Sequence, residues 1–311
     1  MRGLIAFTQG RVARWLGFIL SGLALIAFLL VMRDALSLRD GGVALTAHGP
    51  ALLGALLLYG ATYGAMVHAW IVLARGCGAS ASGADLTRTF LISQIAKYLP
   101  GNVGQFIGRT WSGQALGISL KTLGTAMALE VAGVFLACAI FAGVALASDP
   151  TAPSLPTGAG AGMVRPIVIV IAMACALAGA AFILRRRADI SSVLMPFVAA
   201  GGCYLMVFVL LAAANVLLVS DISGHWGWTA SARIAGAFAV SWLVGFVTPG
   251  SPAGLGLREL TFFSMLAGIF PNETLVLAAA LFRIATVSGD LMAWLVGIAM
   301  KPTPNAKRHA A

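Results

Sequence analysis

The chain has 311 residues, of which 60% are hydrophobic and only 10% are charged, and its mean hydropathy is +0.96. These values exclude a soluble globular domain and indicate an integral membrane protein. The net charge of +10 does not indicate a nucleic-acid partner, because the basic residues are spread through short loops and form no stripe. Cys77, Cys138, Cys175 and Cys203 are widely spaced and lack a CxxC or His pairing, so we predict neither a disulfide framework nor a metal site, and no cofactor.

The first apolar run, Trp15–Met32, follows Arg2, Arg11 and Arg14. It is longer than the apolar core of a usual signal peptide and no small-residue cleavage site follows, so we predict an uncleaved first helix. Further runs are long enough to cross the ~30 Å hydrocarbon core of a bilayer. Together with the first run they give six full transmembrane helices, at residues 15–32, 52–74, 122–147, 164–184, 196–219 and 275–300.

Two other apolar stretches are broken by Pro-Gly clusters at Pro100 and Pro249. At ~1.5 Å per residue, each half of a broken stretch reaches only about the bilayer midplane. We therefore predict two re-entrant helical hairpins, with halves at residues 87–99 and 103–119 and at residues 233–247 and 255–270. Irregular backbone at membrane depth is tolerated where it is buried in protein or lines a polar cavity, so paired breaks point to a transporter site.

Charge in the loops favours this topology. A single crossing at the first break would place Arg185, Arg186 and Arg187 outside, against the positive-inside rule, whereas a hairpin keeps them cytoplasmic. The order helix, helix, hairpin, helix then occurs twice in opposite orientation, which is an inverted repeat. The predicted all-α polytopic protein has both termini in the cytoplasm. Its parts are a first repeat (1–148), an external linker (149–163), a second repeat (164–301) and a cytoplasmic tail (302–311).

The hairpin tips are candidate anion sites. The second half-helix of each hairpin starts at the tip, so its free N–H groups and positive dipole end lie near mid-membrane. Glycines there allow close approach of the backbone, and neighbouring Lys and Arg add charge that suits a phosphate. The predicted substrate-binding residues of the two tips are Lys97, Gly101, Asn102, Gly104, Arg109, Gly250, Ser251, Gly254, Arg258 and Glu259. The alternative is that Pro and Gly only kink ordinary membrane helices.

Glu130 and Arg283 complete the predicted site. Each lies about eight residues into its span, from opposite membrane faces, so their heights differ by only about 6 Å. We predict that they meet, directly or through a substrate headgroup; the alternative is an ion pair that only locks the two halves together. Asp290 and His68 are candidate proton relays, although an interfacial hydrogen-bonded histidine is the simpler interpretation of His68.

No catalytic constellation is found. Ser288-Gly289-Asp290 lacks the second intramembrane aspartate that an aspartyl protease needs, and neither GxSxG nor HExxH occurs. We therefore predict a transporter-like protein and no enzyme.

Three segments carry a family resemblance: KYLPGNVGQFIGR (Lys97 to Arg109), PGSPAGLGLRE (Pro249 to Glu259) and LFRIATVSGD (Leu281 to Asp290), together with Glu130. They resemble the lysylphosphatidylglycerol synthase transmembrane region family of flippase-like bacterial and archaeal membrane proteins. The resemblance covers nearly the whole chain and implies lipid translocation. Two-domain members join this unit to a soluble aminoacyltransferase, which this chain lacks, so we do not expect it to make lysyl lipid. For some stand-alone members, the resemblance implies hopanoid or glycolipid pathways. The second motif departs from the family by inserting Ser251-Pro252-Ala253 between glycines.

The resulting hypothesis is a lipid flippase or scramblase of the bacterial inner membrane that moves a phosphate-bearing lipid, whether aminoacylated or polyprenyl. An ion-coupled small-solute transporter, or a non-transporting scaffold for a separate lipid-modifying enzyme, are the alternatives. The small-residue positions Gly60 and Gly64 are explained equally by a homodimer and by packing within the chain.

Overall fold

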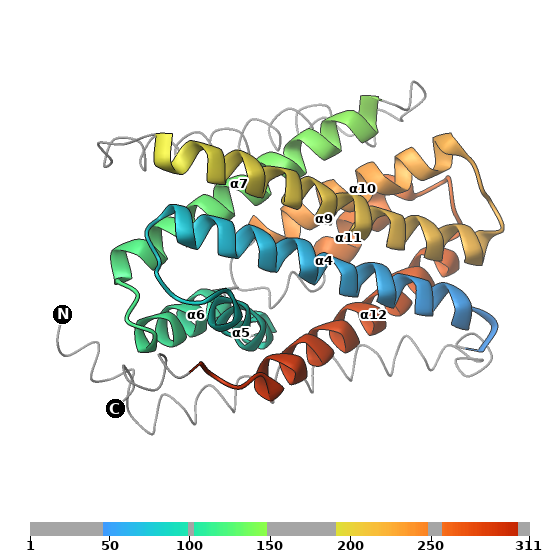
Figure 1. The fold of residues 1–311 in the computed structure, drawn as a ribbon. Coiled ribbons are helices and arrows are strands. Elements are labelled where there is room, and N and C mark those ends of the chain that lie inside the picture. Colours follow the sequence, from blue (N-terminus) through green and yellow to red (C-terminus); the bar gives the residue numbers. More distant parts are fainter. Residues whose placement is uncertain (1–45, 99–102, 148–190, 248–256, 304–311) are drawn as a thin grey trace.

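The computed structural model describes residues 46–98, 103–147, 191–247 and 257–303 (Figure 1). The regular elements in this part of the chain are all helices. In order they are α4 (Gly49–Gly76), α5 (Gly83–Gln94), the 3-10 helix η1 (Ile95–Tyr98), α6 (Gly104–Ala115), α7 (Leu120–Ala147), α9 (Ser191–Ser223), α10 (Trp228–Val247), α11 (Leu257–Leu266) and α12 (Asn272–Ala299).

Five of the described helices, α4, α7, α9, α10 and α12, are long and apolar enough to cross a membrane. Four of these match predicted full-length spans to within a few residues, whereas the predicted spans at 15–32 and 164–184 lie outside the described residues. The fifth corrects a prediction. We expected a half-length helix from Arg233, but α10 begins at Trp228 and has 20 residues. Small, uncharged residues before Arg233 extend the helix, so a lone arginine does not mark its start.

The helices α4 and α9 lie side by side in the middle of the bundle (Figure 1). The last helix of the second half, α12, packs against α4 and α5, while α7 of the first half packs against α9 and α10. Each of these contacts in one half thus has a counterpart in the other half. The long helices of the two halves are intermingled, and neither half forms a separate layer.

Two glycines allow close contacts between the central helices α4 and α9 and the last long helix of the opposite half. A β-carbon on Gly289 of α12 would lie 2.5 Å from Cδ1 of Tyr59 on α4, and one on Gly133 of α7 would lie 2.9 Å from Cε2 of Tyr204 on α9. Real β-carbons do not come so close to other atoms, so each tyrosine ring packs against a helix backbone that only glycine leaves open. A tyrosine of each central helix therefore meets a glycine of the other half.

At each Pro-Gly break the helices on either side contact each other, α5 with α6 and α10 with α11. In the first pair, a β-carbon on Gly108 would lie 3.6 Å from Cβ of Ser93, so α5 and α6 pack closely against each other. The helical part before the break changes from α to 3-10 geometry at Ile95 and is described as far as Tyr98. The predicted tip residues Gly101, Asn102, Gly250, Ser251 and Gly254 lie outside the described residues.

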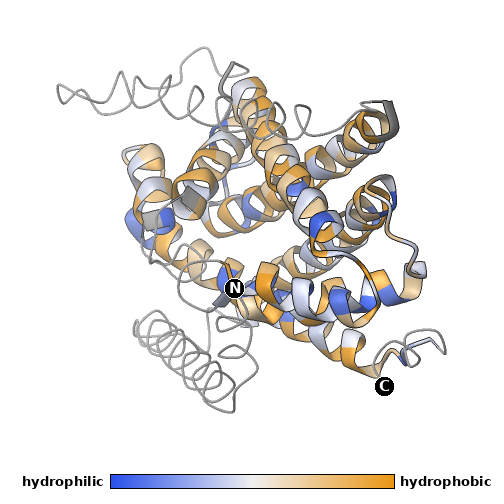
Figure 2. Ribbon diagram, turned by 90° about the vertical axis from the view of Figure 1, so that its left-hand side faces the viewer, coloured by the Kyte–Doolittle hydropathy of each residue, from blue (hydrophilic) through white to orange (hydrophobic). Residues whose placement is uncertain are grey.

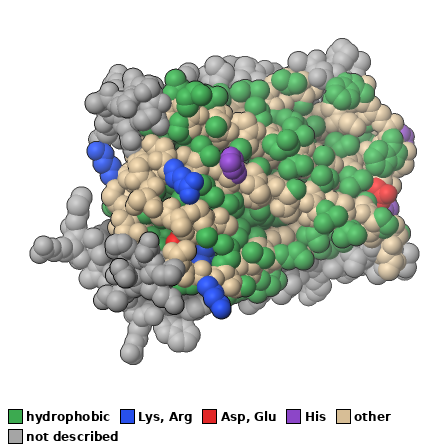
Figure 3. All heavy atoms as spheres, viewed as in Figure 1, with side chains coloured by type: hydrophobic (Ala, Val, Ile, Leu, Met, Phe, Trp, Pro, Cys, Tyr) green, Lys and Arg blue, Asp and Glu red, His purple; other side chains and the backbone are tan. Residues whose placement is uncertain are grey.

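The described surface is largely apolar. Hydrophobic side chains cover most of the face in Figure 3, while the Lys and Arg side chains visible there gather toward one end, and hydrophobic positions occur on every described helix in Figure 2. Large apolar side chains such as Leu57 and Val144 are 65% and 63% exposed, whereas the charged side chains of Arg109 and Asp290 are completely buried. This distribution, apolar outside and charged inside, suits helices that face lipid.

Candidate functional site

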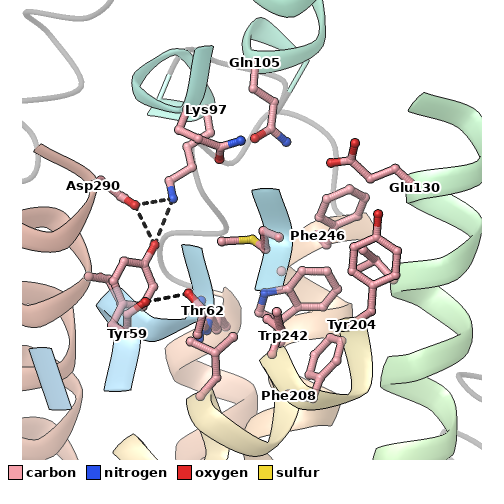
Figure 4. A pocket seen from close by; sticks show the side chains of 18 of the residues that line it. Tyr59, Thr62, Lys97, Gln105, Glu130, Tyr204, Phe208, Trp242, Phe246 and Asp290 are labelled. Carbon is pink, nitrogen blue, oxygen red and sulfur yellow. Dashed lines mark hydrogen bonds and ion pairs between the residues drawn. The ribbon is translucent and has the colours of Figure 1, made fainter. Parts of the chain in front are cut away.

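A cavity of about 200 Å³ lies between the helices, and every described helix contributes at least one residue to its wall. The wall is amphipathic (Figure 4). Lys97, Gln105 and Glu130 are on one side of it, and a group of aromatic side chains from α9 and α10 is on the other. In that group Trp242 stacks on Phe246 with ring centroids 5.2 Å apart and meets Phe208 edge to face at 5.1 Å. The apolar side is therefore a packed aromatic surface.

The carboxylate of Asp290 is the centre of a buried hydrogen-bond cluster. The hydroxyls of Tyr59 and Tyr63 donate to its Oδ1 at 2.6 and 2.5 Å, and the hydroxyl of Tyr98 donates to its Oδ2 at 2.5 Å. The ammonium of Lys97 donates to the same Oδ1 at 2.7 Å and to the Tyr59 hydroxyl at 3.0 Å. A buried carboxylate requires this many partners because an unpaired charge in a low-dielectric interior costs several kcal/mol.

Three elements assemble this cluster. Tyr59 and Tyr63 are four residues apart on α4 and so share one face of that helix. Gly289, next to Asp290 on α12, lets the Tyr59 ring approach closely enough to donate. Lys97 and Tyr98 come from η1, which leads into the first break. The cluster therefore ties the segment before the first Pro-Gly break to α4 and α12.

A second buried charge, Arg109 on α6, pairs with Glu130 on α7. The Arg109 guanidinium is fully buried and lies over the rings of Phe90 and Trp70, at 4.3 and 4.6 Å from their centroids. Its Nε and Nη2 atoms have no hydrogen-bond partner among the described residues. Aromatic faces and a single carboxylate thus hold this charge behind the cavity wall.

The third ion pair joins Arg283 on α12 to Glu259 on α11, with Nε donating to Oε1 at 2.8 Å and Nη2 donating to the same oxygen. This arrangement corrects the predicted direct contact between Glu130 and Arg283, whereas a contact through a substrate headgroup stays a prediction. Both of those residues line the cavity, but each is paired with a residue of the short helix that precedes its own span. The prediction compared only heights in the bilayer, and the height of a residue does not show which face of a helix it occupies.

The two pairs follow the same plan with opposite charges. In the first half, the short helix after the break carries the cation Arg109 and the following long helix carries the anion Glu130. In the second half, the short helix carries the anion Glu259 and the following long helix carries the cation Arg283. Each short helix is thereby fastened to the next long helix by one ion pair.

Arg258, the neighbour of Glu259 on α11, is different from these residues. Its guanidinium lies over the rings of Phe238 and Phe282, 5.0 and 5.4 Å from their centroids, and its side chain lines the cavity. Arg283 and Glu259 are close enough to act on its charge. Within the part of the chain that the structure describes, however, Arg258 makes no hydrogen bond or ion pair, since the three carboxylates of the site are joined to other cations.

The charges of the site do not cancel. The described cations and anions in and directly behind the wall are Lys97, Arg109, Arg258 and Arg283 against Glu130, Glu259 and Asp290, which is 4 − 3 = +1. Tyr204, a residue only 3% exposed, also lines the cavity, and its buried hydroxyl has no hydrogen-bond partner among the described residues. A net positive cavity with an unused hydroxyl suits an anionic ligand.

Of the predicted site residues, Lys97, Glu130, Arg258 and Arg283 line the cavity. Arg109 and Glu259 pair with wall residues, and Gly104 is buried at the start of α6. Asp290, predicted as a proton relay, is the centre of the tyrosine cluster, whereas His68 is absent from the cavity wall.

The tyrosines were missed by the sequence analysis. The chain has four of them, Tyr59, Tyr63, Tyr98 and Tyr204; three donate to Asp290 and the fourth lines the cavity. A usable signal was present, because tyrosine in membrane proteins is enriched at the interfaces, and here Tyr59, Tyr63 and Tyr204 fall well inside apolar runs.

The fold and the cavity define a class, the all-helical multi-pass membrane proteins with an internal charged site. Comparison with protein families, curated proteins and solved structures finds no match for the chain. The resemblance to the lysylphosphatidylglycerol synthase transmembrane region family therefore stays a prediction, and the functional argument depends on the site itself.

Proposed function

We propose that this protein is a lipid translocase, a flippase or scramblase, that moves a phosphate-bearing lipid across the bacterial inner membrane. One observation carries the proposal: an amphipathic cavity inside a bundle of apolar helices contains a guanidinium, that of Arg258, with no carboxylate partner among the described residues. A phosphate is the natural partner of such a group.

The aromatic side of the cavity favours a lipid over a small solute. A lipid headgroup enters with apolar glycerol-ester or prenyl carbons attached, and the packed surface around Trp242 offers those carbons contact while the acyl chains stay in the bilayer. A small hydrophilic solute gains nothing from that wall, because burying its polar surface there leaves hydrogen bonds unmade.

The reciprocal helix contacts support movement between two states. In alternating access the two halves exchange conformations. The contact between α12 and α4 and the contact between α7 and α9 are equivalent, so they would change together. The ion pairs would fasten each short helix to its long neighbour while no phosphate is bound. Arg258 would take the phosphate in the filled site, while Lys97 stays paired with Asp290.

The test is headgroup translocation in proteoliposomes that contain fluorescent phospholipids. We expect translocation by the wild type, strong reduction in Arg258→Gln, and wild-type rates in Lys121→Gln, which removes an exposed cation at the start of α7. Absence of movement for every lipid, with folded and inserted protein, would overturn the proposal. In that event, uptake driven by an ion gradient would identify the solute transporter, and co-purification of a lipid-modifying enzyme would identify the scaffold.

A further inference from the structure

Among the described residues, the cavity has a net charge of +1, which can accept one negative charge, and each of its carboxylates is already paired with a cation. Its surplus of +1 belongs to Arg258. The two carboxylates in its described wall are engaged: Glu130 holds the buried Arg109, and Asp290 receives Lys97 and three tyrosine hydroxyls. Recruiting either carboxylate for a cationic ligand group would leave a buried cation, Arg109 or Lys97, without its partner.

Uncharged hydrogen-bonding groups fill out the polar side of the cavity. Gln94, Gln105 and Tyr204 line it, and neither the two side-chain amides nor the Tyr204 hydroxyl has a hydrogen-bond partner among the described residues. An amide both donates and accepts, and so does a hydroxyl. These groups match the hydroxyls of a glycerol or a sugar and give no preference to an ammonium.

We infer that the ligand is a singly charged phosphodiester lipid whose headgroup ends in uncharged hydroxyls, with Arg258 as its specificity-determining contact. This inference depends on the proposed function and narrows it. A phosphate monoester with two negative charges would exceed the +1 net charge of the site by one charge. An aminoacylated or other amine headgroup would bring a cation that finds no available carboxylate in the part of the wall that the structure describes. The shared chemistry has two sources, a glycerophospholipid with a glycerol headgroup and a polyprenyl phosphate carrying a sugar.

The inference is tested by binding, separately from transport. The full-length protein in phosphatidylcholine nanodiscs is loaded with fluorescent phosphatidylglycerol, and competing lipids displace it. The competitors are phosphatidylglycerol, phosphatidylmethanol (the same charge without hydroxyls), phosphatidylethanolamine, lysyl-phosphatidylglycerol, phosphatidic acid at pH 8, where a phosphate monoester carries about two charges, and a polyprenyl phosphoryl mannose.

We expect the hydroxyl-bearing phosphodiester to bind about tenfold or more tightly than the zwitterionic, cationic and dianionic lipids, and more tightly than phosphatidylmethanol. Arg258→Gln should remove the charge preference. Arg258→Lys should keep part of it, and Tyr204→Phe should reduce only the advantage of hydroxyls. Lys121→Gln is the matched control, since it removes an exposed cation outside the cavity wall. Whichever of the glycerol and mannose lipids displaces the probe at the lower concentration identifies the source.

Equal binding of all headgroups, or an unchanged preference in a folded Arg258→Gln protein, would overturn the inference. A transport assay distinguishes failure of the ligand assignment from failure of the proposed translocase function. Arg258-dependent selective binding without translocation would leave the ligand assignment standing and remove the translocase. Translocation of every headgroup at one rate would support the translocase and remove the ligand assignment.

Discussion

The pair between Lys97 and Asp290 gives the sharpest stability prediction, because the Asp290 side chain is 0% exposed and the Lys97 side chain only 21%. Replacing Lys97 by methionine keeps most of the apolar stem and removes the ammonium. The carboxylate then loses one of its four hydrogen-bond donors and its only ionic partner among the described residues.

Breaking a buried pair by removing one partner typically costs about 3–5 kcal/mol, much of it from the uncompensated charge. Three tyrosine hydroxyls remain on Asp290, so we expect the lower end, about 3 kcal/mol. Replacing Asp290 by asparagine as well removes the stranded charge. The double variant Lys97→Met/Asp290→Asn should therefore recover most of the loss, leaving a cost of about 1 kcal/mol for one missing hydrogen bond.

The assay is a double-mutant cycle on thermal unfolding of the four proteins in one detergent, followed by near-ultraviolet circular dichroism. Because membrane proteins often unfold irreversibly, one scan rate is used throughout and the loss of stability is also measured as a half-life at fixed temperature. If the double variant loses as much as the two single variants added together, Lys97 and Asp290 are independent and the reasoning fails.

Three further predictions use other contacts. Gly289→Ala should destabilise the protein by about 1–3 kcal/mol, because the new methyl group overlaps the Tyr59 ring. Gly124→Ala, which places its methyl group in open space, should not destabilise it. Thermal unfolding of both variants tests this. Glu130→Gln should cost about 3 kcal/mol in the same assay by stranding its buried arginine partner, and equal stability would contradict it. Thr303→Val should destabilise the protein near neutral pH, and in a pH series of unfolding midpoints this effect should shrink as the pH falls below 3.8 toward the lower folded pKa of Asp85.

The Thr303→Val prediction depends on Asp85, at the start of α5. Burial alone would raise the pKa of this carboxyl, but hydrogen bonds from Thr303 and Ser82 outweigh burial and lower the pKa below its ordinary 3.8. Thr303 donates to it through its backbone N–H at 3.1 Å and through its hydroxyl at 2.5 Å. A carboxyl with a lowered pKa stabilises the fold above its ordinary pKa, and that stabilisation disappears as the pH falls through the folded value. A Thr303→Val effect that stays constant from pH 7 to pH 3 would rule out this contact.

The long helices could be predicted from sequence because an apolar run longer than about 17 residues is rarely anything but a membrane-spanning helix. The spans at 52–74, 122–147, 196–219 and 275–300 all became helices with nearby bounds. The helix before the second Pro-Gly break, α10, was harder to predict. Its length depends on whether small, weakly polar residues before Arg233 continue a helix, and hydropathy does not decide that.

The charged residues of the site could be predicted, but their partners could not. An ionisable group in an apolar run is noticeable in any sequence, which is why Lys97, Arg109, Glu130, Arg258 and Arg283 were found. Pairing depends on helix rotation and on contacts between distant segments. Tyrosine hydroxyls are harder still to interpret, since a tyrosine in an apolar run does not reveal whether its oxygen reaches a carboxylate.

The two ion pairs of opposite polarity differ in how accessible they are, and this difference indicates which short helix can respond to a ligand. Arg109 is 0% exposed, covered by two aromatic rings, and its partner Glu130 is 14% exposed. Arg283 and Glu259 are 11% and 23% exposed, and Arg258, which has no ionic partner among the described residues, lies beside them. A phosphate bound to Arg258 lies next to Arg283 and competes with Glu259 for it, while Arg109 is out of reach. We therefore expect ligand binding to loosen α11 from α12 and to leave α6 fastened to α7. In spin-label distance measurements, anionic lipid should widen the distance between α11 and α12 only.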